Sequence, residues 1–259
     1  MIDDENDSEL GGKMTFLEHL DELRRRLIYV LAFITVGFLV SWIFAEKIYD
    51  FIARPIQPFL GENGKLVFTK PTEAFSMYMR VAIFAGIFFT APLIIHQVWL
   101  FIAPGLYRKE KRFALPFVVS SLFLFVGGSA FAYYIVLPAA YKFLINFGSA
   151  FQPLIKIDEY WDLTSTILLG FGLIFQMPVI VAFLSLFGIV TPRFLWKNFR
   201  YAVLVIFIIA AVISPTPDAV TQTVYAAPMI GLYAISILVS LFFKRRRDKR
   251  EKELWGDSA

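Results

Sequence analysis

Six long stretches of this chain contain no charged residue, and they constrain its fold more than any other feature. They cover residues 27–45, 81–107, 113–141, 163–192, 201–217 and 219–243. A bilayer core about 30 Å thick is crossed by a helix of roughly 20 apolar residues, and four of the stretches exceed that length comfortably. Buried helices of a soluble protein would carry charges on their outer faces, yet only 18% of the residues are charged. We therefore predict an all-α polytopic membrane protein with six transmembrane helices.

The last two stretches together are far too long for one span, because residues 201–243 contain a single charge, Asp218, in 43 residues. The sequence SPTPD at residues 214–218 places two prolines within three residues, which removes backbone donors and ends a helix. Residues 201–214 would then rise only about 21 Å. We expect a short fifth span and a sixth that is also short at its outer end.

Proline and glycine positions predict how the helices bend and pack. Five prolines lie in or at the edges of the expected spans: Pro92, Pro116, Pro138, Pro178 and Pro228. Each frees a carbonyl and can bend its helix, which favours a concave bundle over straight rods, although proline is common in membrane helices generally. The small residues 127–130 would permit close contact between helices.

Segments rich in lysine and arginine alternate with segments that hold few, and this pattern predicts the orientation of the chain. Four of these residues precede the first stretch, four lie at 108–112, three at 193–200 and seven at 244–252. The intervening loops hold only four and two. The positive-inside rule then places both termini in the cytoplasm. We divide the chain into a cytoplasmic segment (1–26), a six-helix transmembrane domain (27–243) and a basic cytoplasmic tail (244–259).

The N-terminal segment has its own helical pattern. Residues 15–18, TFLE, match a capping box, and Phe16, Leu20, Leu23 and Leu27 share one face at helical spacing. We expect an amphipathic helix lying against the membrane surface or the bundle. No cleavage site follows residues 27–45, so that stretch is expected to be retained as a span.

Several separated motifs together resemble one family, TatC, the multi-spanning subunit of the twin-arginine (Sec-independent) protein translocase. They are HLDELRRRL (19–27), PTEAF (71–75), APLIIHQVW (91–99), FIAPGLYRKEKR (101–112), FAYY with Leu137 and Pro138 (131–138), FGLIFQMP (171–178), and Pro217 and Asp218 with Gln222. The ordered set covers nearly the whole chain. Its specificity comes from the order, since no single motif identifies the family.

The resemblance implies a receptor in the bacterial cytoplasmic membrane that binds the twin-arginine signal peptides of folded cargo proteins. It further implies partners of the TatA and TatB type, contact with lipids and other copies of itself, and export driven by the proton-motive force. No catalytic activity, cofactor, metal or nucleic acid is expected. In agreement, the chain has no cysteine and no phosphate-binding glycine loop.

The resemblance carries recognition of the paired arginines to Glu22 and Glu110. A guanidinium binds a carboxylate through two parallel hydrogen bonds, a geometry that an ammonium cannot reproduce. The simpler alternatives are that Glu110 relieves repulsion in its basic loop and that Glu22 pairs with Arg26 one turn along the helix. Further candidates for this signal-peptide site are Arg24, which could orient Glu22, and Phe101, Pro104 and Tyr107, which would shape the loop.

A second group of candidates lies within or beyond the membrane. Gln176 is the polar residue nearest the middle of a span, where the family often has glutamate; glutamine can only hydrogen-bond, either to a partner or to a neighbouring helix. Asp218 could cap the sixth helix or contact a partner. Gln222 and Pro55 occupy family positions, and Pro55 would stiffen the long outer loop.

Two other classes of protein remain as alternatives to a translocase receptor. A secondary transporter or channel for a small solute would need titratable groups in mid-span and matching broken helices, whereas the chain offers Gln176 in mid-span and Arg80 near one end. An intramembrane enzyme would need a Ser–His pair, paired aspartates or a metal motif. None of these patterns occurs in the predicted spans.

Overall fold

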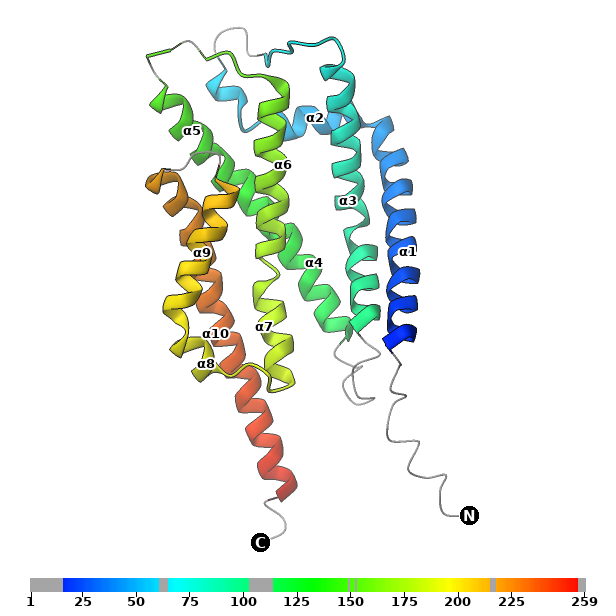
Figure 1. Cartoon of the computed structure of the whole chain (residues 1–259), viewed down its shortest axis with the longest axis vertical. Helices are drawn as coiled ribbons and strands as arrows, with labels where there is room; N and C mark the ends of the chain where they lie inside the picture. The colour runs from blue at the N-terminus through cyan, green and yellow to red at the C-terminus, as the bar shows by residue number, and fades with distance from the viewer. Residues whose placement is uncertain are drawn as a thin grey trace. The chain divides into compact units, whose positions relative to one another are not determined.

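The computed structural model describes residues 16–60, 65–102, 114–148, 150–151, 153–214 and 218–255 (Figure 1). Its helices are α1 (Phe16–Ile43), α2 (Ala45–Ala53), the 3-10 helix η1 (Gln57–Phe59), α3 (Glu73–Ile102), α4 (Ala114–Phe131), the π-helix η4 (Ala132–Val136), α5 (Leu137–Phe147), α6 (Ile157–Ile174), α7 (Met177–Leu186), α8 (Pro192–Lys197), α9 (Phe199–Ile213) and α10 (Ala219–Trp255). Within these residues the only β-pairing is a bridge between Val67 and Lys156. The all-α prediction is confirmed.

Five helical segments are long and apolar enough to cross a membrane: Leu17–Ile43, Glu73–Ile102, Leu115–Phe147, Ile157–Leu186 and Ala219–Arg245. The shorter apolar helix α9 has 15 residues, a rise of about 22 Å, so the predicted short fifth span is confirmed. The prediction of a short sixth span is wrong, because its apolar segment runs for 27 residues. Pro228 lies inside α10 without ending it, so the helix continues into the basic tail.

Prolines account for the interruptions in the helices. Pro178 lacks the N–H that would bond the carbonyl of Ile174, and α6 ends at that residue before α7 begins at Met177. Pro138 likewise frees the carbonyl of Tyr134, which lies in the π-helix η4. Pro92 and Pro228 are accommodated inside α3 and α10. The concave shape of the bundle stays a prediction.

The chain forms two compact units, and the first comprises the described residues of Met1–Arg54 and Phe68–Phe123. In it α1 packs along α3 over most of its length, and α2 packs on α3 (Figure 1). Two glycines set this contact: a Cβ on Gly86 would lie 2.6 Å from the Phe38 nitrogen, and one on Gly37 would lie 2.7 Å from the Gly86 oxygen. Real Cβ atoms do not approach backbone so closely, so the two backbones meet only because both positions lack a side chain.

The first helix corrects the expected N-terminal arrangement. α1 runs without a break from Phe16 to Ile43, so the segment predicted to be a separate amphipathic helix forms the first turns of the first span. No glycine or proline lies between Leu17 and Val36 to end the helix. The leucines of its apolar face remain exposed on this chain, with Leu20 and Leu23 each 44% exposed.

Glu73 closes the loop that leads into α3. Its carboxylate accepts hydrogen bonds from the Thr69 backbone N–H (2.7 Å) and the Thr69 hydroxyl (2.8 Å), and the residue is 6% exposed. These bonds satisfy both carboxylate oxygens and fix the first turn of the helix. Glu73 belongs to the PTEAF motif, which the sequence analysis did not assign to a structural role.

We expect Glu73→Ala to lower the thermal unfolding midpoint, because it leaves the Thr69 N–H without its partner in a part-buried loop. The measurement is the thermal unfolding midpoint in detergent, followed by circular dichroism. Glu46→Ala, an exposed glutamate in the first turn of α2, is the matched control and should change stability by less than about 0.5 kcal/mol. Equal effects of the two substitutions would contradict the assigned role.

The second unit comprises Pro55–Val67 and the described residues of Leu124–Ala259. α10 is its central helix and packs on α7, α8 and α9. Ser185 of α7 donates to Ser240 of α10 (2.8 Å), and the Tyr233 hydroxyl of α10 donates to the Leu195 carbonyl of α8 (2.9 Å). Polar side chains therefore join helices within an otherwise apolar core.

Close packing also joins α4 and α6 within the second unit. A Cβ on Gly128 would lie 2.7 Å from the Phe171 carbonyl, whereas one on Gly127 would meet nothing within 4 Å. The predicted close contact at residues 127–130 is thus confirmed for Gly128 and is wrong for Gly127. Ser129 adds a hydrogen bond to the Leu168 carbonyl at 3.1 Å.

Candidate functional site

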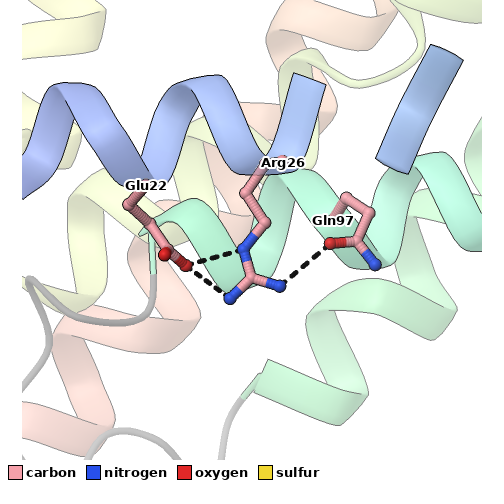
Figure 2. Close-up of polar contacts among 3 residues, drawn as sticks. All are labelled: Glu22, Arg26 and Gln97. Carbon is pink, nitrogen blue, oxygen red and sulfur yellow. Dashed lines mark hydrogen bonds and ion pairs between the residues drawn. The ribbon is translucent and has the colours of Figure 1, made fainter. Parts of the chain in front are cut away.

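Glu22 lies where the first turns of α1 meet the last turns of α3, and it bonds Arg26 (Figure 2). The Arg26 Nε donates to Glu22 Oε1 at 2.7 Å, Nη2 also pairs with that oxygen, and Nη1 donates to Gln97 Oε1 at 3.0 Å. Gln97 is on α3, so the guanidinium joins the two helices. The side chains of Glu22 and Arg26 are only 16% and 23% exposed.

The helical spacing explains this geometry. Glu22 and Arg26 are four residues apart, so their side chains lie on the same face of α1. The structural alternative raised for Glu22 is therefore observed. Among the described contacts it is Arg26, and not Arg24, that bonds Glu22; Arg24 is exposed.

A ring contact lies at the same end of the two helices. His19 of α1 stacks on Phe101 of α3 with ring centroids 4.4 Å apart and an interplanar angle of 18°. Phe101 is half-buried. Three other residues predicted for this site, Pro104, Tyr107 and Glu110, lie outside the described residues. α3 ends at Ile102, the residue after Phe101.

This end of the helix pair has the chemical features of a guanidinium site. A carboxylate that is largely shielded from water forms stronger charge-assisted hydrogen bonds than an exposed one, whose ion pairs are worth only about 0–1 kcal/mol. Glu22 already binds a guanidinium in this structure. That guanidinium belongs to Arg26 of the same helix.

Sequence reasoning missed Gln97 and His19 as parts of this site. Both lie inside motifs that were recognised, HLDELRRRL and APLIIHQVW. Gln97 is buried, at 8% exposure, and a buried polar side chain normally requires a partner. The signal was the polar residue within an apolar stretch, but its partner 71 positions away could only be identified from the packing of α1 on α3.

The membrane candidates occupy separate places in the second unit. Gln176 is half-buried between α6 and α7, and its Nε2 lies 3.4 Å from the Gly172 carbonyl, one turn earlier on the same segment. Gln222 on α10 donates to the Phe207 carbonyl of α9 at 2.7 Å, so it joins two helices. Pro55 is buried at the start of the turn between α2 and η1.

Asp218 has the capping role that was one of its two alternatives. Its Oδ2 accepts a hydrogen bond from the Thr221 backbone N–H at 2.8 Å, three residues into α10. A contact of Asp218 with a partner protein stays a prediction. Among the described residues no group of three or more His, Asp or Glu side chains could hold a metal ion.

Comparison with known proteins gives concordant matches. The family model described as Sec-independent protein translocase protein (TatC) matches residues 18–228. A protein of Koribacter versatilis (strain Ellin345) named Sec-independent protein translocase protein TatC is 51% identical over 245 residues, covering 93% of this chain and 90% of the relative. The protein of the same name from Campylobacter jejuni is 42% identical over 224 residues, covering 85% and 91%.

Solved structures agree with the sequence matches. The chain is similar to a crystal structure described as the twin arginine translocase receptor TatC, with a TM-score of 0.76 and 34% sequence identity. The match covers 87% of this chain and 99% of the crystallised one. A second structure of that receptor, in the detergent DDM, gives the same TM-score.

Proposed function

The chain belongs to the TatC family of Sec-independent protein translocase proteins, and from this premise we propose that it binds the twin-arginine signal peptides of folded proteins at its cytoplasmic face. It is a multi-pass membrane protein and a translocase subunit, not an enzyme. Two solved structures similar to this chain are described as the twin arginine translocase receptor TatC. The proposal assigns receptor function to this chain and recognition to particular side chains.

The observation that carries the proposal is the state of Glu22. Its carboxylate is mostly shielded and already accepts a guanidinium, that of Arg26, which also bonds Gln97 of α3. A signal-peptide arginine would present the same group. Because the guanidinium offers two parallel donors and an ammonium does not, such a carboxylate distinguishes arginine from lysine as well as attracting positive charge.

The second arginine is proposed to bind Glu110. α3 ends at Ile102, eight residues before Glu110, and its Phe101 ring stacks on His19, which lies three residues before Glu22. This stacking supports a site in which the two carboxylates act together. Phe101, Pro104 and Tyr107 would then shape the path of the peptide backbone.

The membrane topology and partners are also proposals. The lysine and arginine distribution supports cytoplasmic termini, which would place Glu22 and the 103–113 loop together at the cytoplasmic side. We propose that Gln176, Asp218, Gln222 and Pro55 contact other subunits of the TatA and TatB type or further copies of this chain. Transport would draw on the proton-motive force.

The test is the binding of a labelled twin-arginine signal peptide to the full chain in nanodiscs of neutral lipid. We expect it to bind roughly tenfold more tightly than its twin-lysine version, because each lysine loses the bidentate geometry. A photo-crosslinker placed at position 109 should react with the twin-arginine peptide preferentially. Equal affinities for the two peptides would contradict the proposed function.

A further inference from the structure

The contact between Arg26 and Glu22 has a consequence for peptide binding. In the structure the proposed recognition carboxylate accepts two donors of a guanidinium from this chain itself, and a third donor of that group bonds Gln97 (Figure 2). The chemical group that would arrive on the signal peptide is therefore already present at the site. An incoming arginine and Arg26 would use the same carboxylate.

We infer that Arg26 is an internal competitor of the signal-peptide arginine and sets the affinity of the peptide site. This inference rests on the proposed function. Arg26 and Glu22 are on one helix turn, so their pairing is intramolecular and needs no association step. The binding free energy that the peptide gains at Glu22 is therefore reduced by the free energy of the bonds that Arg26 loses.

Gln97 makes this exchange easy. It accepts from Nη1 of Arg26 at 3.0 Å, whereas Nε and Nη2 face Glu22. When the peptide takes Glu22, Arg26 can keep its bond to Gln97, so the displaced guanidinium does not lose every partner in a half-buried position. Without peptide, Arg26 would occupy Glu22. After binding, Arg26 would compete with the peptide for Glu22 and so favour release of the cargo.

A competitor and a positioning residue predict opposite effects of substitution. If Arg26 competes for Glu22, its removal should tighten the binding of every peptide that uses Glu22, by the same factor for twin-arginine and twin-lysine peptides, because the competition takes place in the unbound site. If Arg26 instead holds Glu22 in its productive orientation, its removal should weaken binding. The sign of the change distinguishes the two.

The experiment measures peptide dissociation constants for Arg26→Gln in the full chain in neutral nanodiscs. We expect roughly two- to fivefold tighter binding, the range for a part-exposed ion pair. Arg25→Gln is the matched control, since it removes the same charge at the next residue, where Arg25 lies over the Tyr29 ring at 5.9 Å. Arg25→Gln should tighten peptide binding by a smaller factor, which measures the effect of removing one positive charge that repels the cationic peptide.

A double substitution tests whether the effect passes through the carboxylate. In the Glu22→Gln background the gain from Arg26→Gln should fall to that of Arg25→Gln. Arg26→Lys keeps the charge and should give a smaller gain in the same direction. If Arg26→Gln lowers the unfolding midpoint, the same comparison is made with Arg26→Lys.

Two results would overturn the inference alone. One is weaker binding by Arg26→Gln, and the other is a gain no larger than that of Arg25→Gln, in either case while the parent chain still prefers twin arginine and Glu22→Gln still lowers affinity. Failure of the parent to prefer twin arginine would instead overturn the proposed function on which the inference rests.

Discussion

Glu22→Gln is expected to lower the affinity for a twin-arginine signal peptide by roughly 30-fold, because a charge-assisted hydrogen bond to a shielded carboxylate is worth about 2 kcal/mol. The substitution keeps the size of the side chain but removes its charge and one acceptor. It should also reduce the preference for arginine over lysine, since an amide cannot accept two parallel donors. Peptide titration in nanodiscs measures both quantities.

Asp21→Asn is the matched control for this substitution. Asp21 is the neighbouring residue on α1, is exposed, and loses the same charge. Its effect should be limited to a small, salt-dependent change. If Asp21→Asn weakened binding as much as Glu22→Gln, general attraction between charges would explain recognition, and a specific role for Glu22 would be wrong.

Gly86→Ala is expected to destabilise the first unit by about 2–3 kcal/mol, lowering the unfolding midpoint by roughly 4–10 °C. The added Cβ would lie 2.6 Å from the Phe38 nitrogen and 2.8 Å from the Gly37 carbonyl carbon. Both neighbours are backbone atoms and cannot rotate away, so α1 and α3 must separate. The substitution should also weaken peptide binding, because the bond between Arg26 and Gln97 depends on the same packing.

Gly231→Ala provides the control for helix propensity. Gly231 lies within α10, and a Cβ added there would meet nothing within 4 Å. Alanine favours a helix over glycine by up to about 1 kcal/mol, so this variant should be unchanged or slightly more stable. An unfolding midpoint of Gly86→Ala at or above that of the parent chain would show that the close approach of α1 and α3 is not required.

The sequence predicted the membrane segments well because their signal is local. The described residues of the long charge-free stretches lie mostly in apolar helices, and α9 ends at Ile213 whereas α10 begins at Ala219. The errors have local causes too. α2 was not expected, because its nine residues mix charged and apolar side chains. The sixth span was expected to be short at its outer end because of the break at 214–218, whereas its apolar segment starts at Ala219 and runs for 27 residues.

At the candidate site, the motifs predicted residues but not which of them contact one another. The family motifs predict Glu22 and Phe101 as site residues and Arg24 as the residue that orients Glu22. In the structure that contact belongs to Arg26, together with Gln97 from α3. Helical spacing offered Arg26 as the alternative, and motif reasoning alone could not rank the two arginines.

The sequence by itself determined which segments are apolar enough to cross a membrane, where the short fifth span ends and which family the motifs resemble. These properties follow from transfer free energies and backbone chemistry that are summed within one segment. Only the tertiary structure decided that Gly37 meets Gly86, that Gln97 meets Arg26 and that Gln222 joins α10 to α9. Lipid solvates apolar helix faces almost equally, so helix partners are selected by close fit and single polar contacts between residues that are distant in sequence.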